Sequence, residues 1–408
     1  MKRREQSKQH KFKHSNRWYT FETKSVSPKP SPRNSHPTIT SIALDISGRC
    51  NMQCKYCAET ATLPERPSMP DHILNKAVDA VFDQSPKGTG VSIHLGSGEA
   101  FLHPDSVQKI GQKARRMAQD QNRPLALYLT TNATLLNDKI IRWLIKDQWN
   151  VKISIDGGKE IHNRYRIDRR GNGTFEKIEP FVRTLANKIP ERFSTTSVLC
   201  HGTNPEEVFY YIASLGVKKI ELVPVASPQP STLALDEEDL SNYRRFIFDY
   251  ANRILQNKSV PLNIQFKERL KKVLGYGNTR VHCGAGRNFF ASGPDGQLYP
   301  CFRFIGLENY RLGDVESGLD LDRVRWFTDG PGMPYEDRKE CGTCWAAPLC
   351  GGPCFACTEL IKGLDGSPSP EFCSMIRAES EAAVWLSSNM REKAPQKLLE
   401  LIGLQLKE

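Results

Sequence analysis

The sequence predicts an α/β protein in which a parallel sheet is followed by a smaller, cysteine-rich region. Short β-branched runs alternate with amphipathic helical patterns from Ile39 to about Val225. Polar motifs follow the ends of several of these runs, and most of the twelve cysteines lie in the last third of the chain. Strands and helices in alternation indicate a parallel sheet, so we expect one large α/β unit with a second unit after it.

The first 38 residues form a basic segment. They hold ten Lys or Arg residues against Glu5 and Glu22, a balance of +8. The segment is rich in Pro and Ser and lacks a period, so residues 1–38 are predicted to be a disordered or extended arm. It is either a solvated tail or an arm that docks an acidic partner, such as a peptide leader or nucleic acid, through its aromatic residues.

The predicted core barrel covers residues 39–258. Its expected strands are 39–46, 91–97, 125–132, 151–157, 193–200 and 218–225. Helical patterns lie between them, for example at 72–84, 106–120 and 138–148, and residues 236–257 open with acidic residues and then show helical periodicity. Residues 259–279 are expected to be a linker, 280–375 a cysteine-rich domain, and 376–408 one or two amphipathic helices packed on the barrel.

Three cysteines, Cys50, Cys54 and Cys57, form a C-x3-C-x2-C motif after the first expected strand. Three thiolates this close can hold three corners of a 4Fe-4S cube and leave the fourth iron open to a small molecule. The same spacing is also one face of a helix, where cysteines simply pack. Gly48 and Asn51 favour a loop, and a soft sulfur site suits iron-sulfur or zinc.

A second cysteine array follows near the C-terminus. It reads C-x12-G-x4-C, a gap, C-x2-C-x5-C-x3-C, a gap and C, and its members are Cys283, Cys301, Cys341, Cys344, Cys350, Cys354 and Cys373. Paired zinc ribbons are the alternative to iron-sulfur clusters here. Disulfides are not expected, because we see no secretion signal and the cysteines fit ligand roles. No apolar stretch is long enough to span a membrane, so we expect a cytoplasmic protein.

The triplet resembles the cluster loop of radical S-adenosylmethionine (radical SAM) enzymes, and later segments match that family in order. The segment SGEA at 97–100 is similar to a GGEP motif, TTNATLL to a TNGTLL strand end, and SIDG and RYRID to segments near the ribose and carboxylate of the cofactor. The resemblance implies S-adenosylmethionine contacts from Tyr56, Gly98, Glu99, Asn132, Ser154 and Arg166. It also implies a partial (β/α)6 TIM-like barrel with its site at the carboxyl ends of the strands.

The second array resembles the seven-cysteine SPASM extension, which holds two auxiliary clusters. This implies that Cys341, Cys344, Cys350 and Cys373 ligate one 4Fe-4S cluster, and that Cys283, Cys301 and Cys354 ligate the other. The resemblance does not give a fourth ligand for the cluster of Cys283, Cys301 and Cys354. Its fourth iron either has no protein ligand or is bound by Cys357. The implied cofactors are one radical SAM cluster, two auxiliary clusters and S-adenosylmethionine, with a ferredoxin or flavodoxin as electron donor.

The resemblance leads to a first hypothesis: an oxidative maturase that installs a thioether or carbon-carbon cross-link in a ribosomally made peptide. Residues 1–38 are too short and polar for a folded leader-binding domain, so a separate leader-binding protein or the arm itself would recognise the substrate. The alternatives are a formylglycine-generating, sulfatase-maturase-like oxidase and a small-molecule radical SAM dehydrogenase. Sulfatase maturases carry an Asp after the cysteine that corresponds to Cys301, whereas this chain has Phe302.

A non-catalytic metal scaffold that binds nucleic acid is the remaining class. We do not expect it, because the S-adenosylmethionine segments would have no purpose in such a protein. The sequence identifies no catalytic base.

Overall fold

An 11-stranded sheet forms the centre of the protein, in strand order β13-β12-β11-β10-β3-β4-β5-β6-β7-β8-β9. The structure is a computed structural model that describes residues 7–14, 17–24, 37–57, 59, 65–226, 231–277, 280–361, 367–391 and 394–403. The strands from β10 to β9 pair in parallel. The sheet therefore has the architecture of a partial barrel, as predicted from the alternation of strands and helices.

Six parallel strands make the core of the sheet: β3 (Ser41–Leu44), β4 (Val91–Leu95), β5 (Leu125–Thr131), β6 (Asn150–Ser154), β7 (Phe193–Leu199) and β8 (Lys219–Pro224). Each coincides with an expected strand, and only β6 begins one residue earlier, at Asn150. Along β7 every second residue is buried, including Thr195 and Ser197. This period of two directs one set of side chains to the inner face of the sheet.

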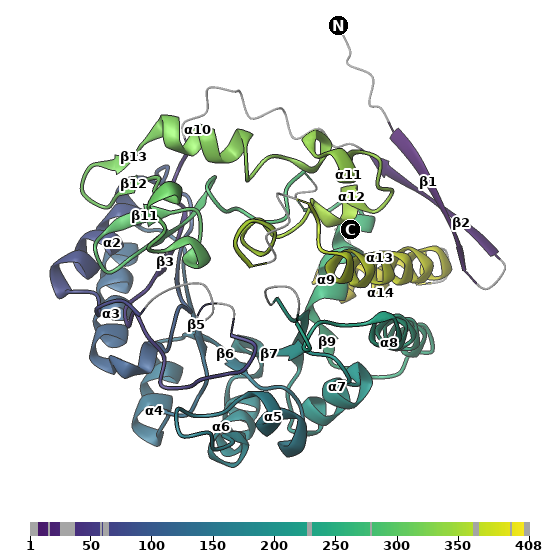
Figure 1. Ribbon diagram of the computed structural model, residues 1–408, viewed down its shortest axis with the longest axis horizontal. Coiled ribbons are helices and arrows are strands. Elements are labelled where there is room, and N and C mark those ends of the chain that lie inside the picture. Colours follow the sequence, from purple (N-terminus) through teal and green to yellow (C-terminus); the bar gives the residue numbers. More distant parts are fainter. Residues whose placement is uncertain are drawn as a thin grey trace, which may run out of the picture.

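Helices cover the outer face of these strands (Figure 1). They are α2 (Asp71–Asp83), α3 (Pro104–Asp120), α4 (Asp138–Lys146), α5 (Lys159–Tyr165), α6 (Phe175–Lys188), α7 (Pro205–Ser214) and α8 (Glu237–Leu255). Several begin at side-chain caps: Asn137 for α4, Asn204 for α7 and a capping box at Asp236 for α8. Among the described residues, none of the helices is both long and apolar enough to cross a membrane.

The region expected to be a linker contains structure, which corrects that prediction. Residues 259–279 include β9 (Leu262–Asn263), which pairs with β8, and α9 (Ile264–Val273). Asn263 caps α9, and Phe266 and Leu270 are buried on one face. Five Lys or Arg residues between 267 and 280 mask this short i, i+4 apolar pattern in the sequence.

The cysteine-rich region extends the sheet at its other edge. It holds β10 (Phe289–Ser292), β11 (Gln297–Tyr299), β12 (Gly313–Asp314), β13 (Gly318–Leu319), α10 (Leu321–Asp329), α11 (Lys339–Gly342), α12 (Ala347–Cys350) and a π-helix at Cys357–Ile361. Strand β10 pairs in parallel with β3, from Phe289 beside Ser41 to Ser292 beside Leu44. The two regions thus share one continuous sheet.

Two helices end the described chain, α13 (Pro370–Met390) and α14 (Pro395–Leu401). Helix α13 packs against α8 and α9 (Figure 1). It includes Cys373, so the predicted domain boundary after residue 375 falls inside a helix. The helix connects the cysteine-rich region to the outside of the barrel.

The N-terminal arm differs from the expectation of disorder. Residues Ser7–His14 (β1) and Arg17–Lys24 (β2) form an antiparallel hairpin, with Ser7 paired to Lys24 and His14 to Arg17. The second strand reads RWYTFETK, which is rich in the aromatic and β-branched residues that favour strands. The remainder of residues 1–36 lies outside the described part of the chain.

Candidate functional site

The predicted binding residues come together at the carboxyl ends of the parallel strands. The cysteine triplet lies in the loop after β3, Glu99 follows β4, Asn132 follows β5, and Ser154 is the last residue of β6. Arg166 follows α5, the helix that comes directly after β6. Parallel strands all end at the same edge, so the topology gathers these side chains although 116 positions separate Cys50 from Arg166.

The triplet loop is irregular rather than helical. The Cys57 amide donates to the Cys54 carbonyl at 3.1 Å, which makes a tight turn. The loop is attached to the segment after α5, where Gln53 N donates to Ile167 O and Lys55 N to Tyr165 O, both at 2.9 Å. All three thiols are partly buried. This arrangement excludes the alternative of one packed helical face.

Gly98 occupies a position that no other residue could fill without strain. Its φ is +59°, and a Cβ there would lie 2.3 Å from Arg49 O. Its amide donates to Glu59 Oε2 at 3.1 Å, and the Ser97 hydroxyl donates to Glu59 Oε1. The turn after β4 therefore presents backbone N–H and hydroxyl donors beside the cysteine loop.

Glu99 and Asn132 connect the ends of β4 and β5 to the triplet. Glu99 is fully buried and accepts from Thr131 Oγ1 (2.8 Å), Asn132 N (2.8 Å) and Phe101 N (3.1 Å). Burial raises its pKa, which these three donors oppose. Asn132 Nδ2 lies 3.6 Å from Cys50 Sγ and 2.9 Å from Asn51 Oδ1. Glu99 thus holds the two strand ends in place, and Asn132 reaches the first thiol.

Tyr56, Asp156 and Arg166 form a buried chain of hydrogen bonds. Arg166 Nη1 donates to the Tyr56 phenol at 2.7 Å, and that phenol donates to Asp156 Oδ2 at 2.5 Å. Arg166 Nε is buried and has no hydrogen-bond partner among the described residues. A buried donor of this kind needs an acceptor, and a guanidinium suits a carboxylate.

Burial disfavours free thiolates in the triplet. Burial raises the pKa of Cys50 to about 11 and also raises the pKa of Cys54. Without a cation both groups therefore stay protonated at neutral pH, whereas metal binding deprotonates such thiols. Three thiols in one loop, beside the open Arg166 Nε, fit a three-cysteine cluster and a ligand with a carboxylate.

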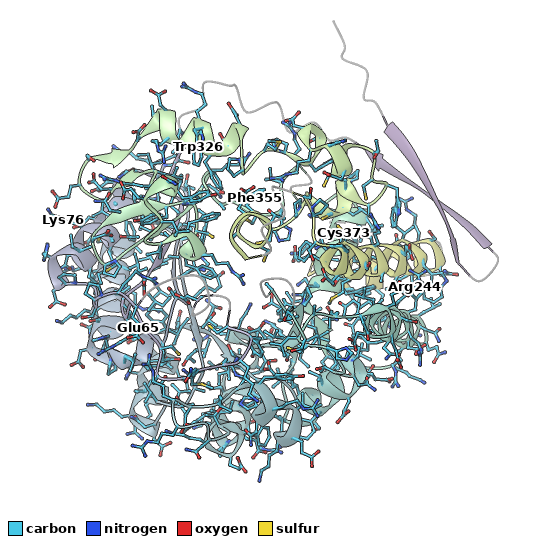
Figure 2. The ribbon with its side chains drawn as sticks, viewed as in Figure 1. Glu65, Lys76, Arg244, Trp326, Phe355 and Cys373 are labelled. Carbon is cyan, nitrogen blue, oxygen red and sulfur yellow. The ribbon has the colours of Figure 1, made fainter. Side chains whose placement is uncertain are left out.

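The seven cysteines of the second array separate into two groups. In one, Cys373 interacts electrostatically with Cys350, Cys341 and Cys344. Cys373, labelled in Figure 2, lies on α13. The other three lie on or near α11 and α12. These four thiols are the set expected to hold one auxiliary cluster. Their ligation of iron stays a prediction.

The other group contains Cys283, Cys301 and Cys354, whose thiols interact electrostatically with one another. Cys357 adds a fourth thiol, which interacts electrostatically with that of Cys354. Arg303 Nη1 also lies 3.6 Å from Cys357 Sγ. The structure therefore brings together the three predicted thiols and the spare one.

Glu59 and Arg303 belong to no sequence motif, so they were not predicted as site residues. Glu59 lies two residues after Cys57, accepts from the Gly98 turn and is ion-paired to Arg66 at 3.2 Å. Arg303 lies two residues after Cys301 and interacts electrostatically with Cys357, Cys354, Cys301 and Glu59. A charged residue two positions after a predicted ligand was the available signal for each.

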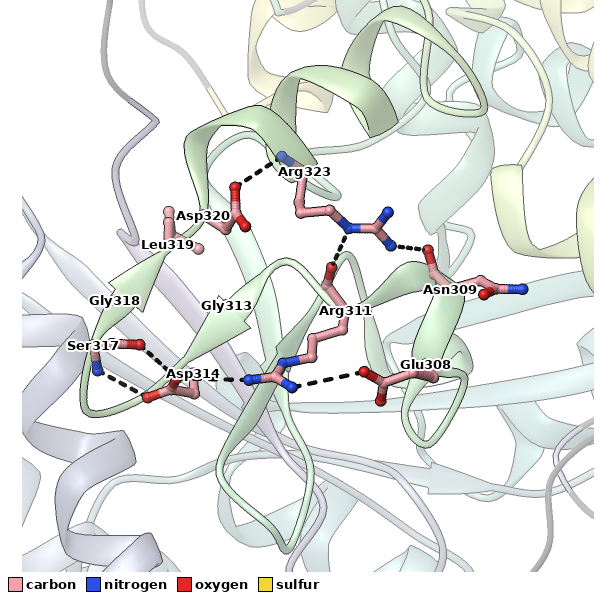
Figure 3. A pocket seen from close by; sticks show the side chains of 10 residues that line it. All are labelled: Glu308, Asn309, Arg311, Gly313, Asp314, Ser317, Gly318, Leu319, Asp320 and Arg323. Carbon is pink, nitrogen blue, oxygen red and sulfur yellow. Dashed lines mark hydrogen bonds and ion pairs between the residues drawn. The ribbon is translucent and has the colours of Figure 1, made fainter.

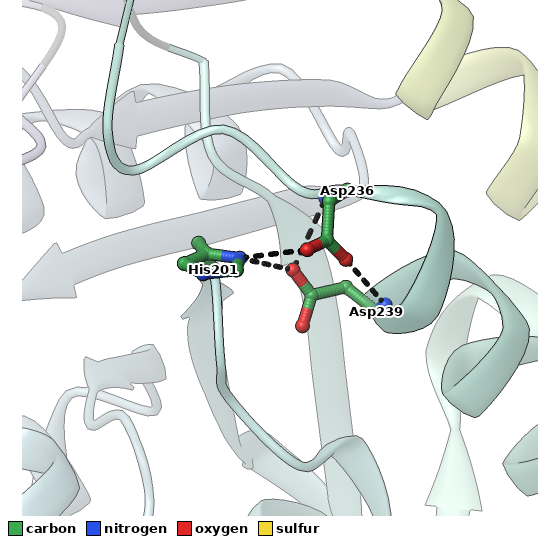
Figure 4. Close-up of side chains that lie close together, drawn as sticks. All are labelled: His201, Asp236 and Asp239. Carbon is green, nitrogen blue, oxygen red and sulfur yellow. Dashed lines mark hydrogen bonds and ion pairs between the residues drawn. The ribbon is translucent and has the colours of Figure 1, made fainter.

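Two other polar features lie away from these thiols. His201, Asp236 and Asp239 gather at the start of α8 (Figure 4), where both carboxylates already cap the helix and His201 Nδ1 lies 2.9 Å from Asp239 Oδ2. We interpret this cluster as a loop anchor. A pocket of about 600 Å³ lies around the β12–β13 hairpin and α10 (Figure 3), and its lining includes no cysteine.

Comparison with known proteins gives consistent matches. The family model described as the radical SAM superfamily matches residues 44–213. A serine-type anaerobic sulfatase-maturating enzyme from Bacteroides thetaiotaomicron is 31% identical over 355 residues, which is 78% of this chain and 83% of that protein. A cysteine-type enzyme from Clostridium perfringens is 23% identical over 343 residues, 79% of this chain and 90% of that protein.

Solved structures match the fold. The structure of anSMEcpe with bound AdoMet and a peptide has a TM-score of 0.73 and 22% identity, covering 86% of this chain and 99% of that chain. The structure of Streptococcus suis SuiB bound to precursor peptide SuiA has a TM-score of 0.54 and 14% identity, covering 78% of this chain and 72% of that chain. The partial barrel with a C-terminal cysteine-rich region is thus a fold shared with both.

Proposed function

This chain belongs to the radical SAM superfamily, in the group of the anaerobic sulfatase-maturating enzymes, and we propose that it oxidises a side chain of a peptide or protein. The named relatives are sulfatase-maturating enzymes of the cysteine and serine types. Two solved relatives of the same fold hold a peptide. The substrate class that we propose is therefore a peptide segment rather than a free sugar or alcohol.

The observation that carries this proposal is the position of Arg303. Its guanidinium lies 3.6 Å from Cys357 in the C-terminal thiol group and interacts electrostatically with Glu59 of the N-terminal loop. Glu59 in turn accepts from Gly98. Side-chain interactions therefore run from the S-adenosylmethionine turn to the auxiliary thiols, and the Arg303–Glu59 step acts at longer range. A substrate bound between them would lie close to both.

When bound, the radical SAM cluster and S-adenosylmethionine supply a 5'-deoxyadenosyl radical that abstracts a hydrogen atom from a carbon. The residues of this chain position the participants. In the proposal, Cys50, Cys54 and Cys57 hold the cluster, Arg166 binds the cofactor carboxylate, and the Gly98 turn lies against the methionyl group. Oxidation of the substrate radical releases one electron, for which the auxiliary thiol groups would provide an iron-sulfur acceptor. A ferredoxin or flavodoxin would supply the reducing electron.

Oxidation of a Ser or Cys side chain to formylglycine is the first candidate reaction, because several relatives that match most of this chain are sulfatase-maturating enzymes. A second candidate is a thioether or carbon-carbon cross-link in a ribosomally made peptide. It is favoured by one observation: Phe302, a half-buried aromatic residue, stands where the sulfatase maturases carry a carboxylate base. Arg303, the next residue, is a cation and cannot replace a base at neutral pH.

The experiment that tests the proposal is anaerobic incubation of the reconstituted enzyme with three substrates: a sulfatase-motif peptide with Cys, the same peptide with Ser, and a peptide encoded beside the gene. Loss of two hydrogens from the Ser peptide, with an aldehyde that reacts with a hydrazine, identifies formylglycine formation. Loss of two hydrogens without an aldehyde identifies a cross-link. If 5'-deoxyadenosine forms while all peptides keep their mass, peptide oxidation is excluded for these substrates. The Cys50/Cys54/Cys57→Ala variant is the control.

A further inference from the structure

Cys357 lies beside Cys354 on one turn of helix. Thr358 N donates to Cys354 O at 3.1 Å, which closes the turn, and Cys357 is the first residue of the π-helix Cys357–Ile361. Residues three apart on a turn have neighbouring side chains, and the two thiols interact electrostatically. Isolated π-helical turns occur often at functional sites. The backbone therefore directs a fourth sulfur toward the group formed by Cys283, Cys301 and Cys354.

Arg303 supplies positive charge to the same place. Its Nη1 lies 3.6 Å from Cys357 Sγ, and it interacts electrostatically with Cys354 and Cys301 as well. Glu59, the carboxylate that interacts with Arg303 at longer range, is already ion-paired with Arg66 at 3.2 Å. The close surroundings of the Arg303 guanidinium are thus sulfur atoms.

Placing the Arg303 guanidinium beside these sulfurs costs free energy unless the sulfurs carry negative charge. Arg303 is half-buried, and a cation partly withdrawn from water needs a charged or strongly accepting partner, whereas neutral thiols are weak acceptors. A 4Fe-4S cluster with four thiolates has a net negative charge, which a neighbouring guanidinium offsets. The four sulfurs and Arg303 therefore match a fully ligated cluster in charge as well as in number.

We infer that Cys357 is the fourth ligand of the auxiliary cluster held by Cys283, Cys301 and Cys354, and that Arg303 hydrogen-bonds to its sulfur. This inference rests on the auxiliary clusters proposed above. Its consequence is that the cluster has no open iron for a substrate thiolate. The cluster then acts as an electron acceptor.

The test uses protein in which Cys50, Cys54 and Cys57 are all replaced by Ala, so that only auxiliary clusters contribute. We expect about eight irons per chain and little three-iron EPR signal after mild oxidation, because both cubes are closed. Adding Cys357→Ala opens one cube, and the three-iron signal should rise to about one spin per chain as that iron leaves. Cys357→Ser, which keeps an oxygen donor, should lose less iron than Cys357→Ala and shift the spectrum of the reduced protein.

The matched control is Cys200→Ala, which removes a fully buried thiol outside both groups and should leave the iron content unchanged. The inference is overturned if Cys357→Ala has the iron content and spectrum of its parent. It is also overturned if the parent already shows the three-iron signal, because the cube is then open with Cys357 in place. If the parent binds no iron, the chain holds no auxiliary clusters, and the proposed function loses its electron acceptor.

Discussion

The Tyr56 phenol donates a 2.5 Å hydrogen bond to Asp156 Oδ2, while Arg166 donates to the same phenol at 2.7 Å. The tyrosine thus connects the cluster loop to the end of β6 and to the segment after α5. Because Asp156 is fully buried, the bond also satisfies a carboxylate that has no access to water.

Replacing Tyr56 by Phe should therefore lower stability and weaken S-adenosylmethionine binding. The change removes the donor to Asp156 Oδ2, while Oδ1 still accepts from Val198 N at 3.0 Å, and it removes the acceptor of Arg166 Nη1. A buried unsatisfied group costs about 1–3 kcal/mol. Tyr165→Phe is the matched control, since its ring lies 6.2 Å from that of Tyr56 and its hydroxyl makes a longer bond, 3.3 Å to His201 O. Urea unfolding and calorimetric titration with S-adenosylmethionine measure both effects. Equal losses in the two variants would contradict the role of the hydrogen-bond chain.

The Cys50/Cys54/Cys57→Ala variant should lose one cluster and keep the others. Iron should fall from about twelve to about eight atoms per chain, and 5'-deoxyadenosine formation should stop. Iron analysis and chromatography of the quenched reaction provide the measurements. Retention of all the iron, or loss of all of it, would show that the three thiols do not form an independent site.

Phe302→Asp should increase formylglycine formation on a sulfatase-motif peptide. The substitution places a carboxylate next to Cys301, where the sulfatase maturases carry their base, and a positioned base contributes about 100-fold or more in favourable cases. Phe302→Asn is the control, because asparagine has nearly the same shape as aspartate but carries no negative charge. Mass spectrometry of the peptide measures aldehyde yield. Equal yields from both variants would argue against general-base catalysis at this position.

Glu379 should matter for stability far more than Glu381 on the same helix. Glu379 is buried and accepts from Tyr243 Oη at 2.7 Å and from Arg269 Nε at 3.2 Å, which joins α8, α9 and α13. Glu379→Ala leaves Arg269 as a buried charge without its carboxylate, which costs about 3–5 kcal/mol. Glu381→Ala breaks a partly exposed pair with Arg244 and should cost at most about 1 kcal/mol. Equilibrium unfolding of the two variants gives the comparison, and similar costs would contradict it.

Acid should destabilise the protein through His94. Burial, with a contribution from Lys152, lowers the pKa of His94 to about 4 from 6.5. Between these two pH values the unfolded chain therefore binds more protons than the folded protein. The contribution of neutral His94 to the free energy of unfolding is fully present above about pH 6.5, and about 2–3 kcal/mol is lost as the pH approaches 4. His94→Gln should flatten this part of the profile, whereas exposed His72→Gln should not. An unchanged slope in His94→Gln would show that other groups cause the acid sensitivity.

The order of strands and helices could be predicted from residue patterns because each core strand is short, β-branched and bounded by polar residues. Helix α9 was missed because five basic residues surround its two apolar anchors, Phe266 and Leu270. Its existence depends on β9 pairing with β8 and on burial against α13, which no local pattern contains. The hairpin of residues 7–24 was missed for a similar reason, since net charge dominated the interpretation of its aromatic strand.

The sequence by itself determined the candidate residues for the chemistry, because cysteine spacing and glycine placement are local properties of the chain. It predicted the triplet, the Gly98 turn and Arg166 from short motifs. Only the tertiary structure decided which side chains meet. Arg303 and Glu59 are 244 positions apart, and neither belongs to a motif, so their proximity follows from β10 pairing with β3. In the same way, the sequence left Cys357 as a spare thiol, and the helical turn beside Cys354 placed it with the other three.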